Sequence, residues 1–449
     1  MVSFLVGCGA GFSGDRVDAA APVVQTLINR KQPAALMFEM LAERTLATAQ
    51  LQRRANPDRG YEPLLELELT PILKDCLEHR ITIVSNFGAA NPMGAAKAIH
   101  RLAQQLGLKK PKIAVVTGDD LSSSQGLSII KETLAKQDEP FDSEKFVCAN
   151  VYQGAFEIAE AIKAGAEIVV TGRVADPSLA LGPAIAHFGW GKDDLNALAG
   201  ATMAGHLLEC GAQVTGGYFA DPGRKDVPGM DCVGFPIAEI RSDGSCIITK
   251  ADNTGGAVNT LTVKEQLLYE VHDPAAYITP DVIADLSHAI IKQVGPNAVS
   301  LEGVIGHRRT DTLKANIFFD GGWFGEGEIS YAGPNANGRA QLAIDTLRKR
   351  NASRMPLRFD LIGLVSIMGD DKGNMLQTTP IGNPPELRVR VASKHNDEAE
   401  IDWLLRDITA LWTGGPAGGG GVRTAKRQRL RLVSCLIPRS LAPATWEFV

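Results

Sequence analysis

The stretch that decides the fold is residues 2–16, VSFLVGCGAGFSGDR, an apolar run that ends in a glycine-rich turn. Residues 2–6 are uncharged and β-prone, which is typical of a strand buried on both faces of a sheet. After the turn, residues 20–29 repeat apolar side chains at the spacing of one helical face. We therefore expect a strand, a tight turn and a helix at the start of an α/β fold.

The turn also has the G-x-G-x-x-G spacing by which backbone amides approach a pyrophosphate, at Gly9, Gly11 and Gly14. Three residues argue against a nicotinamide cofactor. Asp15 would repel a phosphate, Pro22 suits only the first turn of a helix, and Glu39 lies beyond the usual spacing of about 20 residues to a ribose-binding acid. We favour a cradle for another ligand, with a structural turn and an NAD(P) site as alternatives.

Composition restricts the classes of function. The chain has 449 residues and a formal net charge of −5 with both signs interspersed, so no nucleic-acid partner is expected. No apolar run reaches the roughly 18–20 residues that span a bilayer. The seven cysteines are scattered without a C-x-x-C pair, which fits reduced thiols in the cytoplasm. We expect no membrane partner, and homo-oligomerisation.

Apolar runs alternate with helical patterns over residues 1–205. Strands are expected at residues 2–6, 34–38, 81–85, 112–117 and 167–171. This alternation predicts a parallel, Rossmann-like sheet with its ligand crevice at the carboxyl ends of the strands. The polar turns GCGAG, SNFGAANP, TGDD and TGRVADPS should share that rim.

Residues 206–449 have a different character, with shorter strand-like runs and many turn residues. We interpret them as a mixed α+β lobe that contains the glycine-rich loop 414–421. A ligand cleft is expected between the two lobes. Because the glycine loop lies between a predicted helix at 397–412 and a predicted strand at 429–437, it could pack near a ligand, and Gly418 and Gly419 are its candidate binding residues.

The candidates for catalysis are His206, Glu209 and Cys210, which should lie within one helical turn. A histidine with a carboxylate and a thiol on one face could form an acid/base pair or an activated nucleophile. The alternative is that Cys210 is core, Glu209 pairs locally and His206 is a satisfied polar residue. A divalent metal could instead join Asp176 and Glu209, although the sequence has no metal-binding spacing.

The turn TGRVADPS supplies Arg173 and Asp176 after a buried strand. Arg173 could grip a carboxylate or phosphate while Asp176 orients it or acts as a base; the alternative is an Arg–Asp pair that pins the loop. In SNFGAANP, Asn86 and Asn91 offer amide donors of the oxyanion-hole type, or simply form a turn.

Further binding candidates come from two other segments. Glu39 and Glu43 could face one side of a helix, and if the two carboxylates are close, the pKa of one of them would be raised. The alternative is that Glu43 contacts the edge of the sheet and has no role in binding. If the first turn is one wall of the shared rim, Ser13, Asp15 and Arg16 join its glycines as binding candidates.

Several unusual strings occur together and in order: GAGFSGDR, LAERT, SNFGAANP, TGRVADPS, GHLLECGAQVTGGYF and GPAGGGGVR. With them the chain resembles the acyclic terpene utilisation family AtuA, from residue 3 to about residue 440. The family takes its name from a bacterial pathway that degrades citronellol- and geraniol-type compounds through branched acyl-CoA intermediates. Longer members carry an extra C-terminal ferredoxin-like domain, which we expect this chain to lack.

The resemblance implies a catabolic protein, and no motif identifies a redox cofactor. Our leading hypothesis is a lyase, hydratase or hydrolase acting on a small carboxylic acid or a branched acyl-CoA, with His206 and Glu209 as proton carriers. The alternatives are a non-catalytic subunit that binds acyl-CoA or organises a complex, and an NAD(P)-dependent oxidoreductase.

Overall fold

The computed structural model describes residues 3–380, 382 and 384–449. Val2, where the first strand was expected to begin, lies outside them. Contacts divide the chain into two compact units: residues 1–141, 147–317 and 433–449 form the first, and residues 142–146 and 318–432 form the second. The boundary expected at residues 205–206 lies inside helix α9 (Leu195–Glu209) of the first unit.

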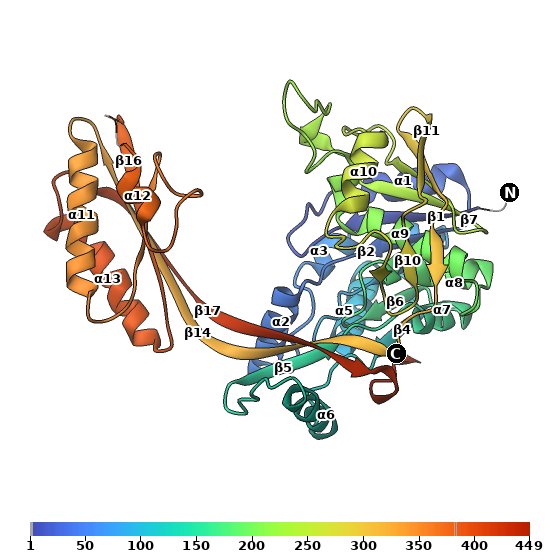
Figure 1. Cartoon of the computed structure of the whole chain (residues 1–449). Helices are drawn as coiled ribbons and strands as arrows, with labels where there is room; N and C mark the ends of the chain where they lie inside the picture. Colours follow the sequence, from blue (N-terminus) through green and yellow to red (C-terminus); the bar gives the residue numbers. More distant parts are fainter. Residues whose placement is uncertain (1–2, 381, 383) are drawn as a thin grey trace. The chain divides into compact units, whose positions relative to one another are not determined.

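The first unit is built on a ten-stranded mixed sheet in the order β11-β12-β8-β7-β1-β2-β3-β6-β4-β18 (Figure 1). Five neighbouring strands are parallel: β1 (Ser3–Ala10), β2 (Ala34–Phe38), β3 (Thr82–Ser85), β6 (Ile168–Thr171) and β4 (Ile113–Thr117). The predicted α/β class is thus confirmed, and all five expected strands are present to within a few residues.

Antiparallel strands extend both sides of this parallel core. They are β7 (Pro236–Arg241), β8 (Cys246–Lys250), β12 (Ala298–Glu302), β11 (Ile290–Gly295) and, beside β4, β18 (Thr445–Phe448). A separate small sheet contains β9 (Tyr277–Ile278), β10 (Ile283–Asp285) and β13 (Ile305–His307). Segments from beyond residue 206 therefore join the same sheet as β1.

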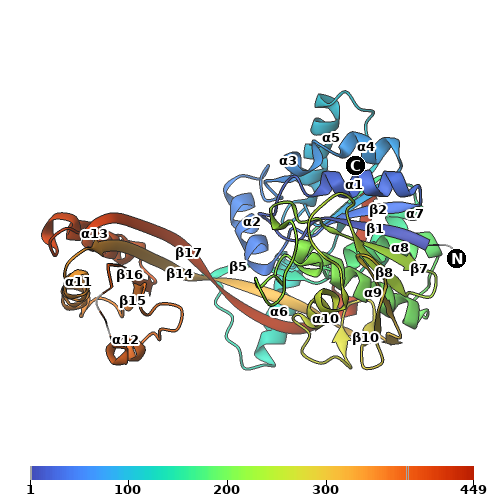
Figure 2. The same cartoon turned by 90° about the horizontal axis from the view of Figure 1, so that it is seen from above.

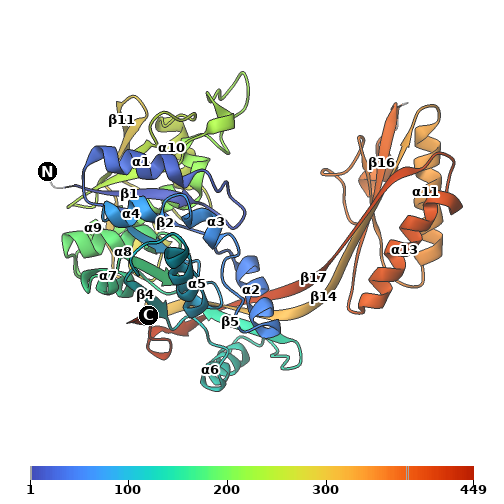
Figure 3. The same cartoon turned by 180° about the vertical axis from the view of Figure 1, so that it is seen from behind.

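Helices cover both faces of the sheet. Helix α1 packs against β1 (Figure 2). Helices α8 and α9 lie in front of the sheet in Figure 1, and α1 and α5 lie in front of it in the opposite view of Figure 3. The helices of this unit are α1 (Ala20–Arg30), α2 (Glu43–Ala55), α3 (Leu65–Leu69), α4 (Leu73–Glu78), α5 (Pro92–Gln105), α6 (Ser124–Ala135), α7 (Phe156–Lys163), α8 (Ser178–Phe188), α9 and α10 (Thr260–Leu268). Covered on both sides, β2 and β6 are buried at every residue, which explains their unbroken apolar sequences.

Apart from the short helix α12, the second unit has the β-α-β-β-α-β order of a ferredoxin-like fold, and it is inserted between residues 317 and 433 of the first unit instead of following it. Its sheet runs β15-β16-β14-β17, and its elements are β14 (Thr312–Ala332), α11 (Ala336–Asn351), β15 (Arg358–Ile362), α12 (Asn374–Thr378), β16 (Glu386–His395), α13 (Glu398–Gly414) and β17 (Gly420–Pro438). Helices α11 and α13 both contact β16 and enclose a separate core. The first part of β14 also pairs with β5 (Phe146–Val151).

Candidate functional site

The turn after β6 brings Arg173 and Asp176 together. Arg173 is 2% exposed, and all three nitrogens of its guanidinium donate to protein acceptors: Nε to the Val174 carbonyl at 2.8 Å, and the terminal nitrogens to Val174, the Leu41 carbonyl and the Asp176 carboxylate. Its plane lies over the Tyr152 ring at 4.6 Å. Arg173 therefore fixes the position of Asp176, and this geometry favours the alternative in which the pair pins the loop over a direct grip on a ligand anion.

Asp176 lines a cavity of about 240 Å³ within the first unit. Polar side chains from both sides of residue 205 line the same cavity: Tyr152, Tyr277, Thr279, Thr310, Thr312 and Lys314. The side chains of Asp176 and Lys314 are 36% and 49% exposed, so both can meet a ligand. A carboxylate, an ammonium group and two phenols thus surround one small space.

Glu43, at the start of α2, supports this cavity from the side. It accepts a hydrogen bond from the Tyr152 hydroxyl at 2.5 Å and lies 3.6 Å from the Lys314 ammonium. Burial raises the pKa of Glu43, but the Tyr152 hydrogen bond and the Lys314 charge outweigh it, so the pKa is lowered overall. Glu39 precedes α2, so the expectation that it shares a helix face with Glu43 is wrong.

His206 and Glu209 form a buried pair at the end of α9, as their spacing predicts. Nδ1 of His206 lies 2.8 Å from Oε1 of Glu209, and the imidazole packs against the Tyr277 ring at 5.2 Å between centroids. Burial raises the pKa of Glu209 to about 7. Burial lowers the pKa of His206, but the Glu209 charge outweighs it and raises it overall. The pair can therefore exchange a proton near neutral pH.

Two atoms of this pair, Nε2 of His206 and Oε2 of Glu209, are buried without a hydrogen-bond partner among the described residues. Cys210 follows the end of α9 rather than lying on it. Burial raises the pKa of the Cys210 thiol to about 12, so the thiol is protonated near neutral pH. This environment does not activate Cys210 as a nucleophile.

Glu39 is buried and is held by Asn86. It accepts hydrogen bonds from the Leu41 amide and from Nδ2 of Asn86, both at 2.8 Å, and Oδ1 of Asn86 accepts from the Met40 amide at 2.7 Å. Burial, followed by the negative charge of Asp176, raises the pKa of Glu39 to about 8. Both ends of the Asn86 amide are in use, so Asn86 fixes Glu39 instead of offering a donor to a ligand.

The glycine turn after β1 is closed by its own carboxylate. Asp15 accepts hydrogen bonds from the Gly11 and Arg16 amides, both at 2.9 Å. Arg16 pairs with Asp18 at 2.9 Å. The turn also needs glycine for packing, because a Cβ on Gly11 would lie 2.3 Å from the backbone nitrogen of Gly211. The Gly11 amide is therefore already in use, and α1 begins at Ala20 with Pro22 in its first turn.

Other predicted residues lie away from the Asp176 cavity. Asn91 caps α5 by accepting from the Gly94 amide at 3.0 Å, and its Nδ2 donates to backbone carbonyls of the 57–59 loop. Gly9 packs against the Phe38 ring. Gly14 has a positive φ of 125°. Gly418 and Gly419 belong to the second unit, between α13 and β17.

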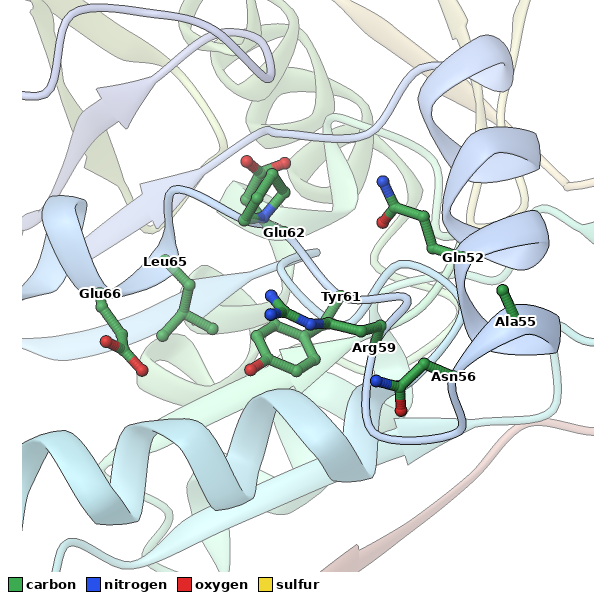
Figure 4. Close-up of a pocket in the computed structure, with 9 residues that line it drawn as sticks. Gln52, Ala55, Asn56, Arg59, Tyr61, Glu62, Leu65 and Glu66 are labelled. Carbon is green, nitrogen blue, oxygen red and sulfur yellow. The ribbon is translucent and has the colours of Figure 1, made fainter. Parts of the chain in front are cut away.

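Ser13 hydrogen-bonds to Glu62, which lines a larger cavity of about 480 Å³ beside α2 and α3. Figure 4 shows this cavity, which Arg59, Tyr61 and Glu62 line together with Gln52 of α2. None of the predicted site residues lines it. Burial raises the pKa of Glu62, and the Ser13 hydrogen bond only partly offsets this.

Sequence reasoning missed Tyr152, Tyr277 and Lys314. Each lies outside the five predicted parallel strands, and only the tertiary fold brings them to Asp176. Within the described part of the chain, no three His, Cys, Asp or Glu side chains are placed to hold a metal ion. None of the helices described there combines the length and apolar character that a membrane crossing needs.

The comparisons with known proteins agree with the resemblance of the motifs. No curated protein and no solved structure matches the chain. A family model does: the one described as acyclic terpene utilisation family protein AtuA matches residues 4–448. This match takes in the five parallel strands, the Asp176 cavity and the whole second unit. The chain therefore belongs to the acyclic terpene utilisation family AtuA.

Proposed function

We propose that this protein is an enzyme without a redox cofactor, of the lyase, hydratase or hydrolase type, and that it acts on a small carboxylic acid or a branched acyl-CoA in the Asp176 cavity. One observation carries the proposal: a carboxylate held by a buried arginine opens onto a cavity that also holds an ammonium group and two phenols. These are the groups that acid/base chemistry beside an anionic or carbonyl-bearing substrate requires.

The roles follow from position. Asp176 is the proton acceptor or donor, because burial raises its pKa and its side chain meets the cavity. Lys314 binds the negative charge of the carboxylate, or the thioester oxygen as charge develops on it. Tyr277 lines the cavity and packs against His206, so the buried His206–Glu209 pair lies one ring away from the cavity and is a second candidate proton carrier.

The test uses two conservative variants and one control. Asp176→Asn keeps the shape of the side chain and removes its proton transfer, so turnover across a panel of branched acyl-CoA thioesters and their free acids should fall at least about 100-fold. Lys314→Gln should mainly raise KM. Asp58→Asn, an exposed carboxylate in the 56–59 loop, is the matched control and should retain full activity.

Far-UV circular dichroism and Tm establish that each variant is folded. Full activity of Asp176→Asn on a substrate that the wild type turns over would overturn the assignment. Tight binding of an acyl-CoA by the wild type, with no turnover across the panel, would favour the other reading of the same cavity, a non-catalytic subunit that holds acyl-CoA.

A further inference from the structure

A second polar cavity, of about 310 Å³, lies at the same edge of the sheet on the side of β4. It shares no lining residue with the Asp176 cavity. Its walls come from α2, the turn before α5, the end of β4 and β5. Its polar lining is Gln50, Arg53, Thr117, Asp119, Asp120, Asn150 and Asn91, which the sequence had proposed as a binding residue; the rest of its lining is Ala89, Ala90, Pro92, Met93, Val115 and Gly118.

Two carboxamides in this lining each have an unused hydrogen-bonding atom. Gln50 is 6% exposed and its Nε2 donor has no partner among the described residues. Asn150 is 1% exposed, and its Oδ1 acceptor likewise has none. A buried polar atom without a partner costs more free energy than an ordinary hydrogen bond contributes. The wall of the cavity therefore has one unpaired donor and one unpaired acceptor, in two side chains that line it.

The neighbouring groups determine the orientation of the Asn150 carboxamide and the net charge of the cavity lining. Nδ2 of Asn150 donates to Asp119 at 2.9 Å, which leaves Oδ1 as its free atom. Asp119 is buried, and its carboxylate also accepts from the Arg173 amide at 2.8 Å. Arg53 donates to the Ala90 carbonyl at 2.5 Å and lies 3.7 Å from Asp120, so the positive charge of this lining is already balanced. An anionic ligand would meet two carboxylates and no unbalanced cation.

We propose that this cavity binds a neutral hydroxylated small molecule of the sugar or polyol type. A hydroxyl group both donates and accepts, so adjacent hydroxyls can take a hydrogen bond from Nε2 of Gln50 and give one to Oδ1 of Asn150. The carboxylate of Asp119 accepts from a third hydroxyl. The C–H face of such a molecule packs against the apolar wall around Pro92 and Met93.

The experiment measures binding of D-ribose, D-glucose, myo-inositol and glycerol to the full chain by ligand-observed NMR, followed by calorimetric titration of the best probe. Acetate and adenine serve as anionic and planar comparators. Gln50→Met removes the free donor at nearly constant volume and should weaken binding about tenfold. Gln50→Glu replaces the donor by an acceptor and should weaken binding at least as much.

Gln52→Met is the matched control, because Gln52 is exposed on the same helix and does not line this cavity; binding should be unchanged. The proposal is overturned if no hydroxylated probe binds, if acetate or adenine binds in their place, or if Gln50→Met and Gln50→Glu bind as the wild type does. The last result would mean that water alone satisfies Gln50 and Asn150. Turnover in the Asp176 cavity is a separate readout, so this proposal and the proposed function can fail independently.

Discussion

The turns after β1 and β6 both end parallel strands at one edge of the sheet, and both contain an arginine beside an aspartate. After β1, Asp15 binds amides of its own turn and Arg16 pairs with an exposed Asp18. After β6, Arg173 is buried and holds Asp176 toward a cavity. The two turns therefore share a position at the rim but differ in how the aspartate is used: Asp15 is bound by its own turn, whereas Asp176 is held by a buried arginine at the wall of a cavity.

The largest expected difference concerns the two arginines. Arg173→Met leaves Asp176 and two backbone carbonyls without their buried donor, so the free energy of unfolding should fall by about 3–5 kcal/mol. Arg16→Met removes a largely exposed pair and should cost less than about 1 kcal/mol. Denaturant unfolding of both variants measures the contrast. Equal losses in the free energy of unfolding would show that the two Arg–Asp pairs contribute equally to stability, which would contradict the difference between the two turns.

The next effect concerns Glu68 on α3, whose pKa is raised by burial and by the charges of Asp15, Glu62 and Asp18. Glu68 is fully buried, both carboxylate oxygens lack partners among the described residues, and its pKa is raised to about 8. The folded state holds this proton more tightly than the unfolded state does. Wild-type stability should therefore fall as pH rises from about 4.5 to about 8.

Glu68→Met removes that penalty, so the variant should be more stable than wild type by about 3 kcal/mol near pH 8, with a smaller gain near pH 5. Glu66→Met on the same helix is the control, because Glu66 is exposed and no comparable gain is expected. Denaturant unfolding at several pH values gives the curve. A gain that does not depend on pH would show that packing, rather than charge, is responsible.

A smaller effect is expected from Asp15 itself. Asp15→Ala leaves the Gly11 and Arg16 amides without their acceptor and should lower the free energy of unfolding by about 1–2 kcal/mol. Asp18→Ala, at an exposed site in the same loop, should cost less. Thermal or denaturant unfolding compares them, and a neutral Asp15→Ala would mean that water replaces the carboxylate at no cost.

The last prediction is that nicotinamide cofactors have no effect on thermal stability. Because Asp15 already occupies the Gly11 amide, NAD and NADP should not change the Tm of the wild type. The same titration on Asp15→Ala shows whether the carboxylate is the reason. If the cofactors stabilise the variant and not the wild type, the Asp15 carboxylate alone excludes the dinucleotide. Stabilisation of the wild type would restore the nicotinamide reading of the turn.

Much of the sheet could be predicted because its strands are buried on both faces and so are continuously apolar, as at residues 34–38. The His206–Glu209 contact followed from helical spacing, which is a local property. The partners of Asp176 could not be predicted in this way. Tyr152 directly follows β5, Tyr277 lies on β9 and Lys314 lies on β14. Their approach to Asp176 depends on long-range pairing, which leaves no periodic signal in the sequence.

The structural roles of Arg173 and Asn86 could not be predicted either. Their side-chain types suit a ligand, but the atoms that compete for them are backbone carbonyls and the buried Glu39, whose proximity appears only in the folded chain. The glycine turn was different, because Asp15 is close in sequence to the amide that it binds, and its effect on a phosphate could be argued from the sequence alone.

The antiparallel strand β18 pairs with β4 over residues 445–448, more than 300 positions later in the chain. During synthesis on the ribosome, the first unit would thus have most of its sheet while one side of β4 still exposes unpaired amides and carbonyls. Such an edge is a site for mispairing between nascent chains. The second unit emerges from the ribosome during that interval. Residues 318–432 are therefore synthesised, and can fold, before the last strand of the first unit's sheet is available.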